Sequence, residues 1–487
     1  MEHLTFHAAF PYMGTLFFSN RTVKRKEGLM ALTKHIRPGS TDMTSGNPYR
    51  LIVLFSIPLL IGNIFQQLYN MVDSIVVGNV IGETALAAVG TGFPIIFMLS
   101  SLFMGIGSGA TIMIAQFYGA QDTQRIRNTV GTIYTAMIVG IVPLSILGIV
   151  TARPLLTLIQ VPDDGTLDMA VLYMIVIYIG MIGTMGFNVN AGILQGLGDS
   201  RSSLIFLLIA TVVNIVLDLV FTLTFHWGVF GVALATIIAQ LCSWLFGIRF
   251  INKHYDCVHI SLRRFQFDKG LFWEAMRLGI PAGLQQALFS IGMMLMQALV
   301  NSYGSAFIAG FNGANKLDSF AFMPIQSFTT AMTTYTGQNI GAGDLKRVKA
   351  GTRAGLVVCV GFSVVISALL FPFSGAMMRL FSSSKDVIDA GVAYLHTVLP
   401  FYFLLAIVFM YNSILRGTGE MVVPMISSFL ALWLARLPSA YLLSHFFGKE
   451  TIFYSYGIGW FIGGVISAVY YYSGRWKSKS VIRHTAQ

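Results

Sequence analysis

Apolar runs of about 20 residues, each long enough to cross a bilayer core as a helix, recur along nearly the whole chain and limit its possible folds. Inside a bilayer every backbone polar group needs an internal partner, so only helices and closed barrels can cross it. The runs are continuous rather than alternating, which favours helices. Charged residues make up only 10% of the sequence, against roughly 25% in soluble domains. The sequence therefore predicts an all-α polytopic membrane protein.

Tracing the runs gives about twelve transmembrane spans. They are expected at 51–75, 85–115, 129–151, 168–190, 202–224, 229–250, 275–300, 305–337, 352–373, 388–413, 421–443 and 452–473. Most of the 31 Lys and Arg fall in the loops on one side of these spans. The positive-inside rule then places both termini in the cytoplasm. Because topology explains most of the net charge of +11, nucleic acid is not an expected partner.

The two halves of the chain repeat each other in order and at a nearly constant separation. Three pairs of stretches match: Phe55–Pro58 with Leu278–Pro281, Gln116–Asp122 with Gln338–Asp344, and Leu194–Asp199 with Leu415–Glu420. Six helices per repeat is an even number, so both copies enter from the same side and run parallel. Parallel repeats of this kind occur in transporters, where the substrate binds near the bilayer midplane at the repeat interface.

The repeat divides the chain into five parts. We expect a disordered cytoplasmic tail at 1–46, an N-lobe at 47–250, a cytoplasmic linker at 251–270, a C-lobe at 271–475 and a cytoplasmic tail at 476–487. The two lobes are expected to enclose a central cleft.

Three acidic residues lie well inside the apolar spans: Asp73, Asp218 and Asp318. A charge at bilayer depth costs at least about 2.5 kcal/mol, so each is a functional candidate. Asn214 lies four residues before Asp218 and therefore shares its helix face. Carboxylate and amide oxygens together suit either a proton or a hard cation such as Na⁺.

Arg436 is a basic residue within the eleventh span, and it offers Asp318 a counter-charge. In the repeat, Arg436 stands where Asn214 stands in the first half, so the halves differ in charge at an equivalent place. For Asp318, a functional role and a structural ion pair remain equally open.

The chain carries no sequence signature of catalysis. It has no nucleophile elbow, no metal-ligand cluster of His and Cys, and no phosphate-binding Walker loop. We therefore expect neither an enzyme nor a nucleotide-driven pump. No cofactor is expected beyond H⁺ or Na⁺ as coupling ion.

Several stretches resemble the multidrug and toxic compound extrusion (MATE) family over roughly residues 45–475. They are Asp42–Pro48, Asn63–Asp73, the Gln116–Asp122 loop with its repeat, and the Gly-x-Gly-acid loops Gly196–Asp199 and Gly417–Glu420. The resemblance implies two lobes around a cleft and export of cationic or amphipathic organic compounds by H⁺ or Na⁺ antiport. It also implies a monomer in a bacterial inner membrane, with the lipid bilayer and small drug-like molecules as partners.

The resemblance also assigns site residues. The family's N-lobe coupling site matches Asp73, the pair Asn214 and Asp218, and Thr236. Some members carry C-lobe carboxylates where this chain has Leu284-Gln285-Gln286 and Phe403-Leu404-Leu405, so a second cation site of that kind is not expected. Candidates for a C-lobe or substrate site are Asp318, Arg436, Gln285 and Gln286.

Two other functions are compatible with the same spans. A flippase of the wider superfamily, moving a lipid-linked precursor, would need several Arg and Lys facing the cleft, whereas only Lys316 and Arg436 lie within spans. A non-transporting sensor, channel or scaffold would need neither matched repeats nor paired buried carboxylates. The sequence leaves the choice between H⁺ and Na⁺, the cargo and the resting conformation open.

Overall fold

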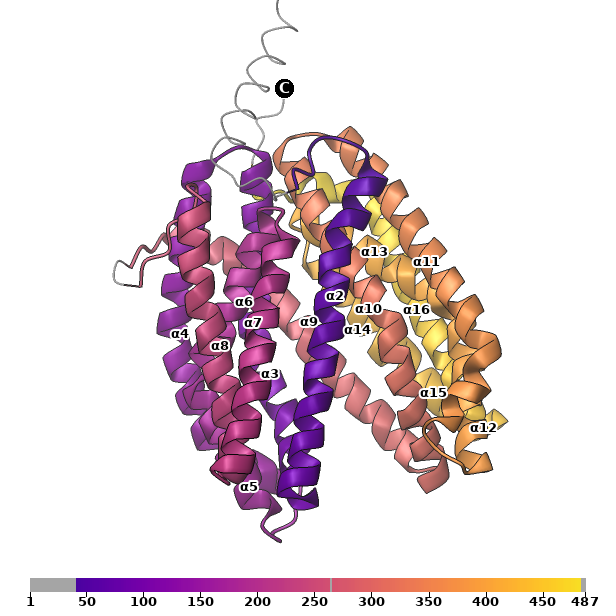
Figure 1. Cartoon of the computed structure of the whole chain (residues 1–487). Helices are drawn as coiled ribbons and strands as arrows, with labels where there is room; N and C mark the ends of the chain where they lie inside the picture. Colours follow the sequence, from indigo (N-terminus) through magenta and orange to yellow (C-terminus); the bar gives the residue numbers. More distant parts are fainter. Residues whose placement is uncertain (1–40, 263–264, 483–487) are drawn as a thin grey trace, which may run out of the picture.

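The computed structural model describes residues 41–262 and 265–482, and these form helices and short connections without a β-strand. Two helical bundles lie side by side, closest at the end where α2 begins and α16 ends and diverging toward the other end (Figure 1). The first bundle is built mainly from α2 (Pro48–Val76), α3 (Glu83–Gly119), α4 (Thr123–Leu158), α5 (Thr166–Ile179), α6 (Met181–Gly196), α7 (Ser200–Leu219) and α8 (Gly228–His254).

The second bundle is built mainly from the helices after the linker. They are α9 (Lys269–Asn301), α10 (Ser305–Gly341), α11 (Leu345–Arg379), α12 (Lys385–Val398), α13 (Tyr402–Thr418), α14 (Val422–Phe429), α15 (Leu437–Phe447) and α16 (Tyr454–Ser473). Three segments are π-helical: η1 (Val77–Ile81) and η2 (Val220–Thr224) end the spans that begin with α2 and α7, and η4 (Leu430–Arg436) lies between α14 and α15. Three short 3₁₀ segments complete the fold: η3 (Leu399–Phe401), η5 (Lys449–Phe453) and η6 (Arg475–Ser478).

Each predicted span corresponds to a helix or to a broken helix. Within the described residues, ten helices are long and apolar enough to cross a membrane, or eleven when α5 and α6, bent by 53°, count as one. The remaining expected span, 305–337, is α10, which has 37 residues. This helix carries Asn315, Lys316 and Asp318, so it is more polar than an ordinary lipid-facing span.

The repeated loop motifs are helix starts. Asp122 caps α4 and Asp344 caps α11, each accepting a bond from a backbone N–H of the first turn. Asp199 caps α7 in the same way after Gly198, whose φ of +88° is a left-handed conformation that favours glycine. The acid that ends each motif therefore satisfies backbone N–H groups that would otherwise lack a partner.

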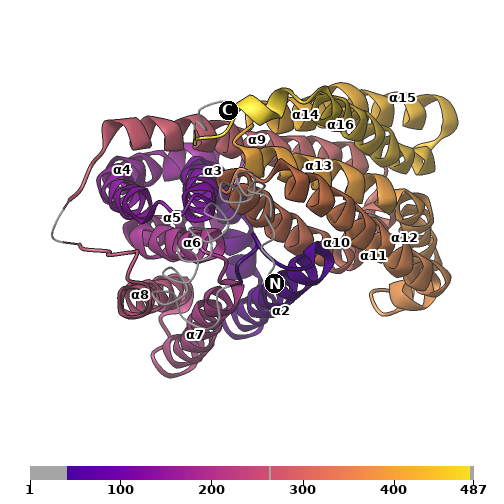
Figure 2. The same cartoon turned by 90° about the horizontal axis from the view of Figure 1, so that it is seen from above.

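The two hydrophobic cores do not follow the midpoint of the chain strictly. Ile52 and Phe55 of α2 are buried in the core of the second half, whereas Ala275 and Leu278 of α9 are buried in the core of the first. The view from above shows α9 passing alongside α3 (Figure 2). Helices α2 and α9, the first of each repeat, thus join the two lobes.

The ends of the chain are more ordered than predicted where the structure describes them. Residues 1–40 of the expected tail lie outside the described residues, but Met43 is fully buried and disorder at 41–46 is therefore wrong. Near the C-terminus Trp476 is only 1% exposed. The linker is shorter than expected, since α8 continues to His254 and α9 begins at Lys269.

Candidate functional site

Asp73, near the end of α2, and Asp218, near the end of α7, face each other in the first lobe. Their carboxyl groups lie close enough to act on each other. Asp218 is 1% exposed and Asn214, one turn earlier on α7, is 2% exposed. Two carboxylates this close repel each other unless a proton or a cation lies between them. The pair can therefore hold a proton or a cation.

Three oxygen atoms at this place have no hydrogen-bond partner: one carboxyl oxygen of Asp73, one of Asp218 and the amide oxygen of Asn214. The amide nitrogen of Asn214 donates to the Thr236 hydroxyl at 3.4 Å, which leaves the amide oxygen as the free end. The Thr236 hydroxyl donates in turn to the carbonyl of Val232 at 3.1 Å. The structure thus brings the four residues of the expected coupling site together.

The donor set at this place consists of oxygen atoms, which suit H⁺ or Na⁺ rather than a metal that prefers sulfur or imidazole. No group of three or more His, Cys, Asp or Glu in the described part of the chain is placed to hold a metal ion. Tyr69 lies one turn before Asp73, and its hydroxyl contacts Thr236. Sequence reasoning missed Tyr69 as a site residue, although its spacing of four from Asp73 was a usable signal.

Both carboxylates stand directly before a π-helical segment. Segment η1 begins at Val77, four residues after Asp73, and η2 begins at Val220, two residues after Asp218. The Thr222 hydroxyl of η2 donates to the backbone carbonyl of Asp218 at 2.5 Å. Both π segments end their spans, so the regular α-helical backbone bonding changes shortly after each carboxylate.

Asp318 occupies a different environment in the second lobe. The Tyr402 hydroxyl donates to its carboxylate, and the Tyr394 hydroxyl, which donates to the Asn315 side chain at 3.3 Å, lies beside it. Asp318 forms no ion pair with Arg436, whose guanidinium instead lies 3.3 Å from the centre of the Tyr456 ring. The two charges act on each other through space, while Tyr402 contacts Asp318 and Tyr456 contacts Arg436.

A cavity of about 450 Å³ lies between the two lobes and is separate from the Asp73–Asp218 pair. Its wall comes from α3 and α6 of the first lobe and from α9, α10, α13, α14, η4 and α16 of the second. Gln285, Gln286 and Arg436 line it, as the candidate substrate site requires. Neither Asp318 nor the four residues of the ion site belong to its wall.

Arg416 is a cavity residue that sequence reasoning missed, because its Gly-x-Gly motif suggested a loop. In the structure α13 continues to Thr418, and Arg416 lies one turn after Asn412 on the cavity wall. One Arg416 nitrogen donates to the side-chain oxygen of Gln285 at 2.6 Å. The Gln285 nitrogen donates to the Ser428 hydroxyl at 2.5 Å. Gln285 therefore fixes the direction of the Arg416 side chain.

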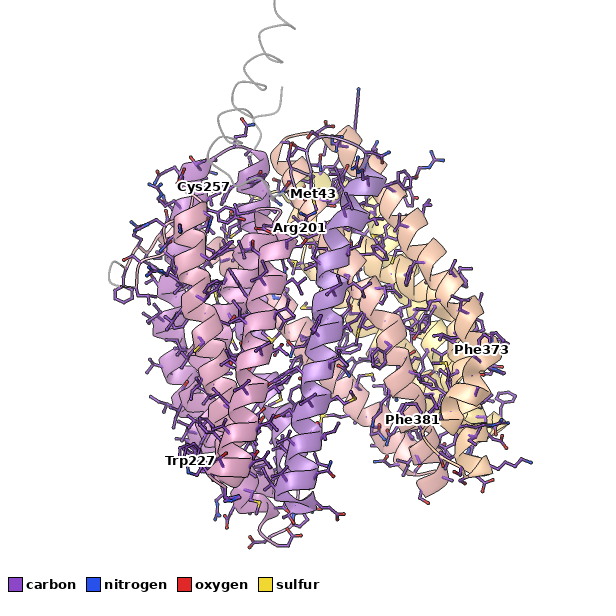
Figure 3. The ribbon with its side chains drawn as sticks, viewed as in Figure 1. Met43, Arg201, Trp227, Cys257, Phe373 and Phe381 are labelled. Atoms are coloured by element: carbon purple, nitrogen blue, oxygen red, sulfur yellow. The ribbon has the colours of Figure 1, made fainter. Side chains whose placement is uncertain are left out.

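The lobes are joined at the end of the molecule where Met43 and Arg201 lie, opposite Trp227 (Figure 3). The side chain of Gln116 donates to the carbonyl of Gly417 at 2.9 Å, and the side chain of Gln338 donates to the carbonyl of Gly196 at 3.1 Å. A glutamine of each lobe thus donates a hydrogen bond to the Gly-x-Gly motif of the other lobe.

The two described chain ends reinforce this junction. The backbone N–H of Met43 donates to the side-chain oxygen of Gln338 at 3.0 Å. The backbone N–H of Val481 donates to the side-chain oxygen of Gln116 at 2.9 Å. The structure therefore closes the central space at the end of the molecule that holds the termini.

The comparisons with known proteins agree with this architecture. The MatE family model matches the chain twice, at residues 58–220 and 281–442, once in each half. The probable multidrug resistance protein YpnP of Bacillus subtilis is 30% identical over 442 residues, which cover 90% of this chain and 98% of that protein. A FAD transporter of Shewanella oneidensis is 24% identical over 443 residues, covering 88% of this chain and 94% of that protein.

A solved structure of the outward-facing conformation of a multidrug resistance MATE family transporter of the MOP superfamily is also similar. It is 25% identical, the match covers 90% of this chain and 98% of that one, and the TM-score is 0.81. The two matched halves, the shared fold and the extent of the similarity to YpnP lead to one conclusion: the chain belongs to the MATE family of multidrug efflux transporters.

Proposed function

We propose that the chain is a secondary antiporter that exports amphipathic organic molecules in exchange for H⁺ or Na⁺. The observation that carries the proposal is the closeness of the Asp73 and Asp218 carboxyl groups, where one oxygen of each and the amide oxygen of Asn214 have no hydrogen-bond partner. An acidic pair of this kind, with Asp218 buried and Asp73 half-buried, is stable when it holds a positive charge and strained when it is empty. Binding and release of one cation therefore changes the energy of the first lobe.

Helix α2 supplies a physical link between this ion site and the cargo path. Its end carries Asp73, while Ile52 and Phe55 near its start belong to the hydrophobic core of the second lobe. A movement of α2 that follows ion binding must therefore shift one lobe against the other. This coupling is the rocking motion through which parallel-repeat transporters alternate their access.

The proposal places the chain in a bacterial inner membrane as a monomer, with the joined end of the lobes in the cytoplasm. The clustering of Lys and Arg in the loops of that side supports this orientation. The structure is then the form closed to the cytoplasm. The likeness to a transporter solved in an outward-facing conformation agrees with it.

The cavity supports an amphipathic cargo. Phe289, Phe322 and Trp460 offer apolar surface, whereas Gln285 and Gln286 offer hydrogen bonds. The expected positive charge on the cargo has no counterpart there, since no acidic residue lines the cavity in the described part of the chain. FAD, which carries phosphates, is the cargo named for one relative, so membership of the family does not require a cation.

The test is transport by the full chain in proteoliposomes under imposed proton or Na⁺ gradients, with a fluorescent lipophilic cation and an aromatic phosphate as parallel cargoes. Asp73→Asn and Asp218→Asn are expected to abolish gradient-driven transport of whichever cargo the wild type moves. Asp163→Asn, in an exposed loop, is the matched control and should transport normally. Normal transport by both site variants would refute the proposal, and the effective gradient identifies the ion.

A further inference from the structure

The central cavity has an unbalanced charge. Its wall includes Arg416 and Arg436 and, in the described part of the chain, no Asp or Glu. The carboxylate of Asp318 acts on Arg436, but it lies outside the wall and accepts a hydrogen bond from the Tyr402 hydroxyl. The cavity is therefore a positively charged space in the middle of an apolar molecule.

Both arginines have donor groups without a partner. The Nε atom of Arg416 and the Nε and Nη2 atoms of Arg436 are buried and make no hydrogen bond. Arg436 is only 5% exposed, so its charge is largely removed from solvent. The Tyr456 ring and the charge of Asp318 stabilise the Arg436 guanidinium in part, but its buried N–H donors remain unfavourable until an acceptor reaches them. An anion in the cavity would satisfy both requirements.

The internal repeat shows that this charge is particular to the second half. Arg416 occupies the position of Gln195 in the first half, and Gln195 also lines the cavity. Arg436 occupies the position of Asn214, which serves the ion site of the first lobe. In both places a neutral amide of the first half is replaced by a guanidinium. The first lobe is thus arranged for a cation and the second for an anion.

We propose that the cargo carries an anionic group, a carboxylate or a phosphate, bound by Arg416 and Arg436. Guanidinium groups bind these anions through paired N–H donors. The apolar part of the cargo then lies against Phe289, Phe322 and Trp460, while Gln285 holds Arg416 in position. The proposal rests on the transport function proposed above and specifies the substrate class of that same cavity.

The experiment measures equilibrium binding of four naphthalene probes to the purified full chain: naphthyl phosphate, naphthoate, neutral naphthylmethanol and cationic naphthylmethylammonium. The wild type is expected to bind the two anions roughly tenfold or more tightly than the neutral probe, because the neutral probe cannot form charged hydrogen bonds with the arginines. Arg416→Gln and Arg436→Gln should each remove most of this preference. Arg353→Gln, exposed on α11, is the matched control and should retain it.

Preference for the cationic probe, or anion binding that both arginine variants retain, would overturn the proposal. Bound naphthyl phosphate is then displaced with a long-chain polyprenyl phosphate or with naphthoate. Much stronger displacement by the polyprenyl phosphate would identify a lipid phosphate as the source of the anion. Stronger displacement by soluble anions would identify a soluble one. Binding does not depend on a gradient. If the anions bind as expected but no ion gradient moves them, the antiport proposal fails while anion recognition stands.

Discussion

Replacing Gly119 or Gly341 by alanine should prevent the closed form of the transporter. A Cβ atom on Gly119 would lie 1.9 Å from the carbonyl oxygen of Gln338, and one on Gly341 would lie 1.8 Å from the carbonyl oxygen of Gln116. Both neighbours are backbone atoms of the other lobe and cannot rotate away. Because real Cβ contacts stay beyond 3.0 Å, either substitution must separate α3 from α10 by about 1 Å or more.

The cost of this separation has two sources. Overpacking of a tight contact costs about 1–3 kcal/mol. The same movement strains the hydrogen bonds from Gln116 to Gly417 and from Gln338 to Gly196, each contributing about 1 kcal/mol. A total of about 3 kcal/mol lowers the ratio of the closed form to other forms by about a hundredfold. The fold within each lobe is not affected, since the contact lies between lobes.

The assay is labelling of Thr330→Cys, a cavity position, by a membrane-impermeant maleimide in a Cys242→Ala background. With intact Gly119 the cysteine should react from the side opposite the termini. With Gly119→Ala it should react from the side of the termini instead. Gly90→Ala, on the same helix as Gly119, is the control, since a Cβ at that position meets nothing within 4 Å. An unchanged labelling side in the Gly119→Ala protein would refute the assigned gate.

Two further substitutions test the two lobes separately. Tyr402→Phe removes a hydrogen-bond donor to the Asp318 carboxylate. The loss of about 1–3 kcal/mol should lower the thermal unfolding midpoint of the purified protein. An unchanged midpoint would show that the bond contributes little. Thr236→Val removes the hydroxyl that accepts a hydrogen bond from Asn214. At an unchanged protein level it should raise several-fold the ion concentration needed for half-maximal transport. An unaltered ion dependence would exclude Thr236 from the ion site.

The positions of the spans could be predicted because each is a separate apolar run, readable without its neighbours. Their lengths could not, since helices such as α4 extend beyond the apolar run at 129–151 to Thr123 and Leu158. Capping by Asp122 allows that extension outside the hydrocarbon. Helix α10 is surrounded by other helices and is therefore more polar than the other spans. A test based on hydropathy alone does not recognise it, although its apolar residues at 305–337 predicted a span.

The candidate site was predictable in part. The spacing of Asn214 and Asp218 places them on one helix face, but their meeting with Asp73 depends on how α2 packs against α7, which no local pattern contains. For that contact the family resemblance carried the prediction. Arg416 was missed because its role depends on α13 continuing through a motif that resembles a turn. Its neighbour Gly417 was recognised only as a repeat, although its carbonyl receives Gln116 of the other lobe.

The charges of the two sites together predict how transport responds to membrane potential. If a monoanion leaves while one cation enters, both movements carry charge in the same sense. A potential of 100 mV, negative inside, then contributes about 2 × 2.3 kcal/mol to each cycle, whereas an equal exchange of cations gains nothing from it. Export of naphthoate from proteoliposomes should therefore accelerate when a potassium diffusion potential is imposed, with the ion gradient held constant. Export that is indifferent to the potential would contradict either the anionic cargo or the exchange for a cation, and the binding preference of the Arg416→Gln variant decides which.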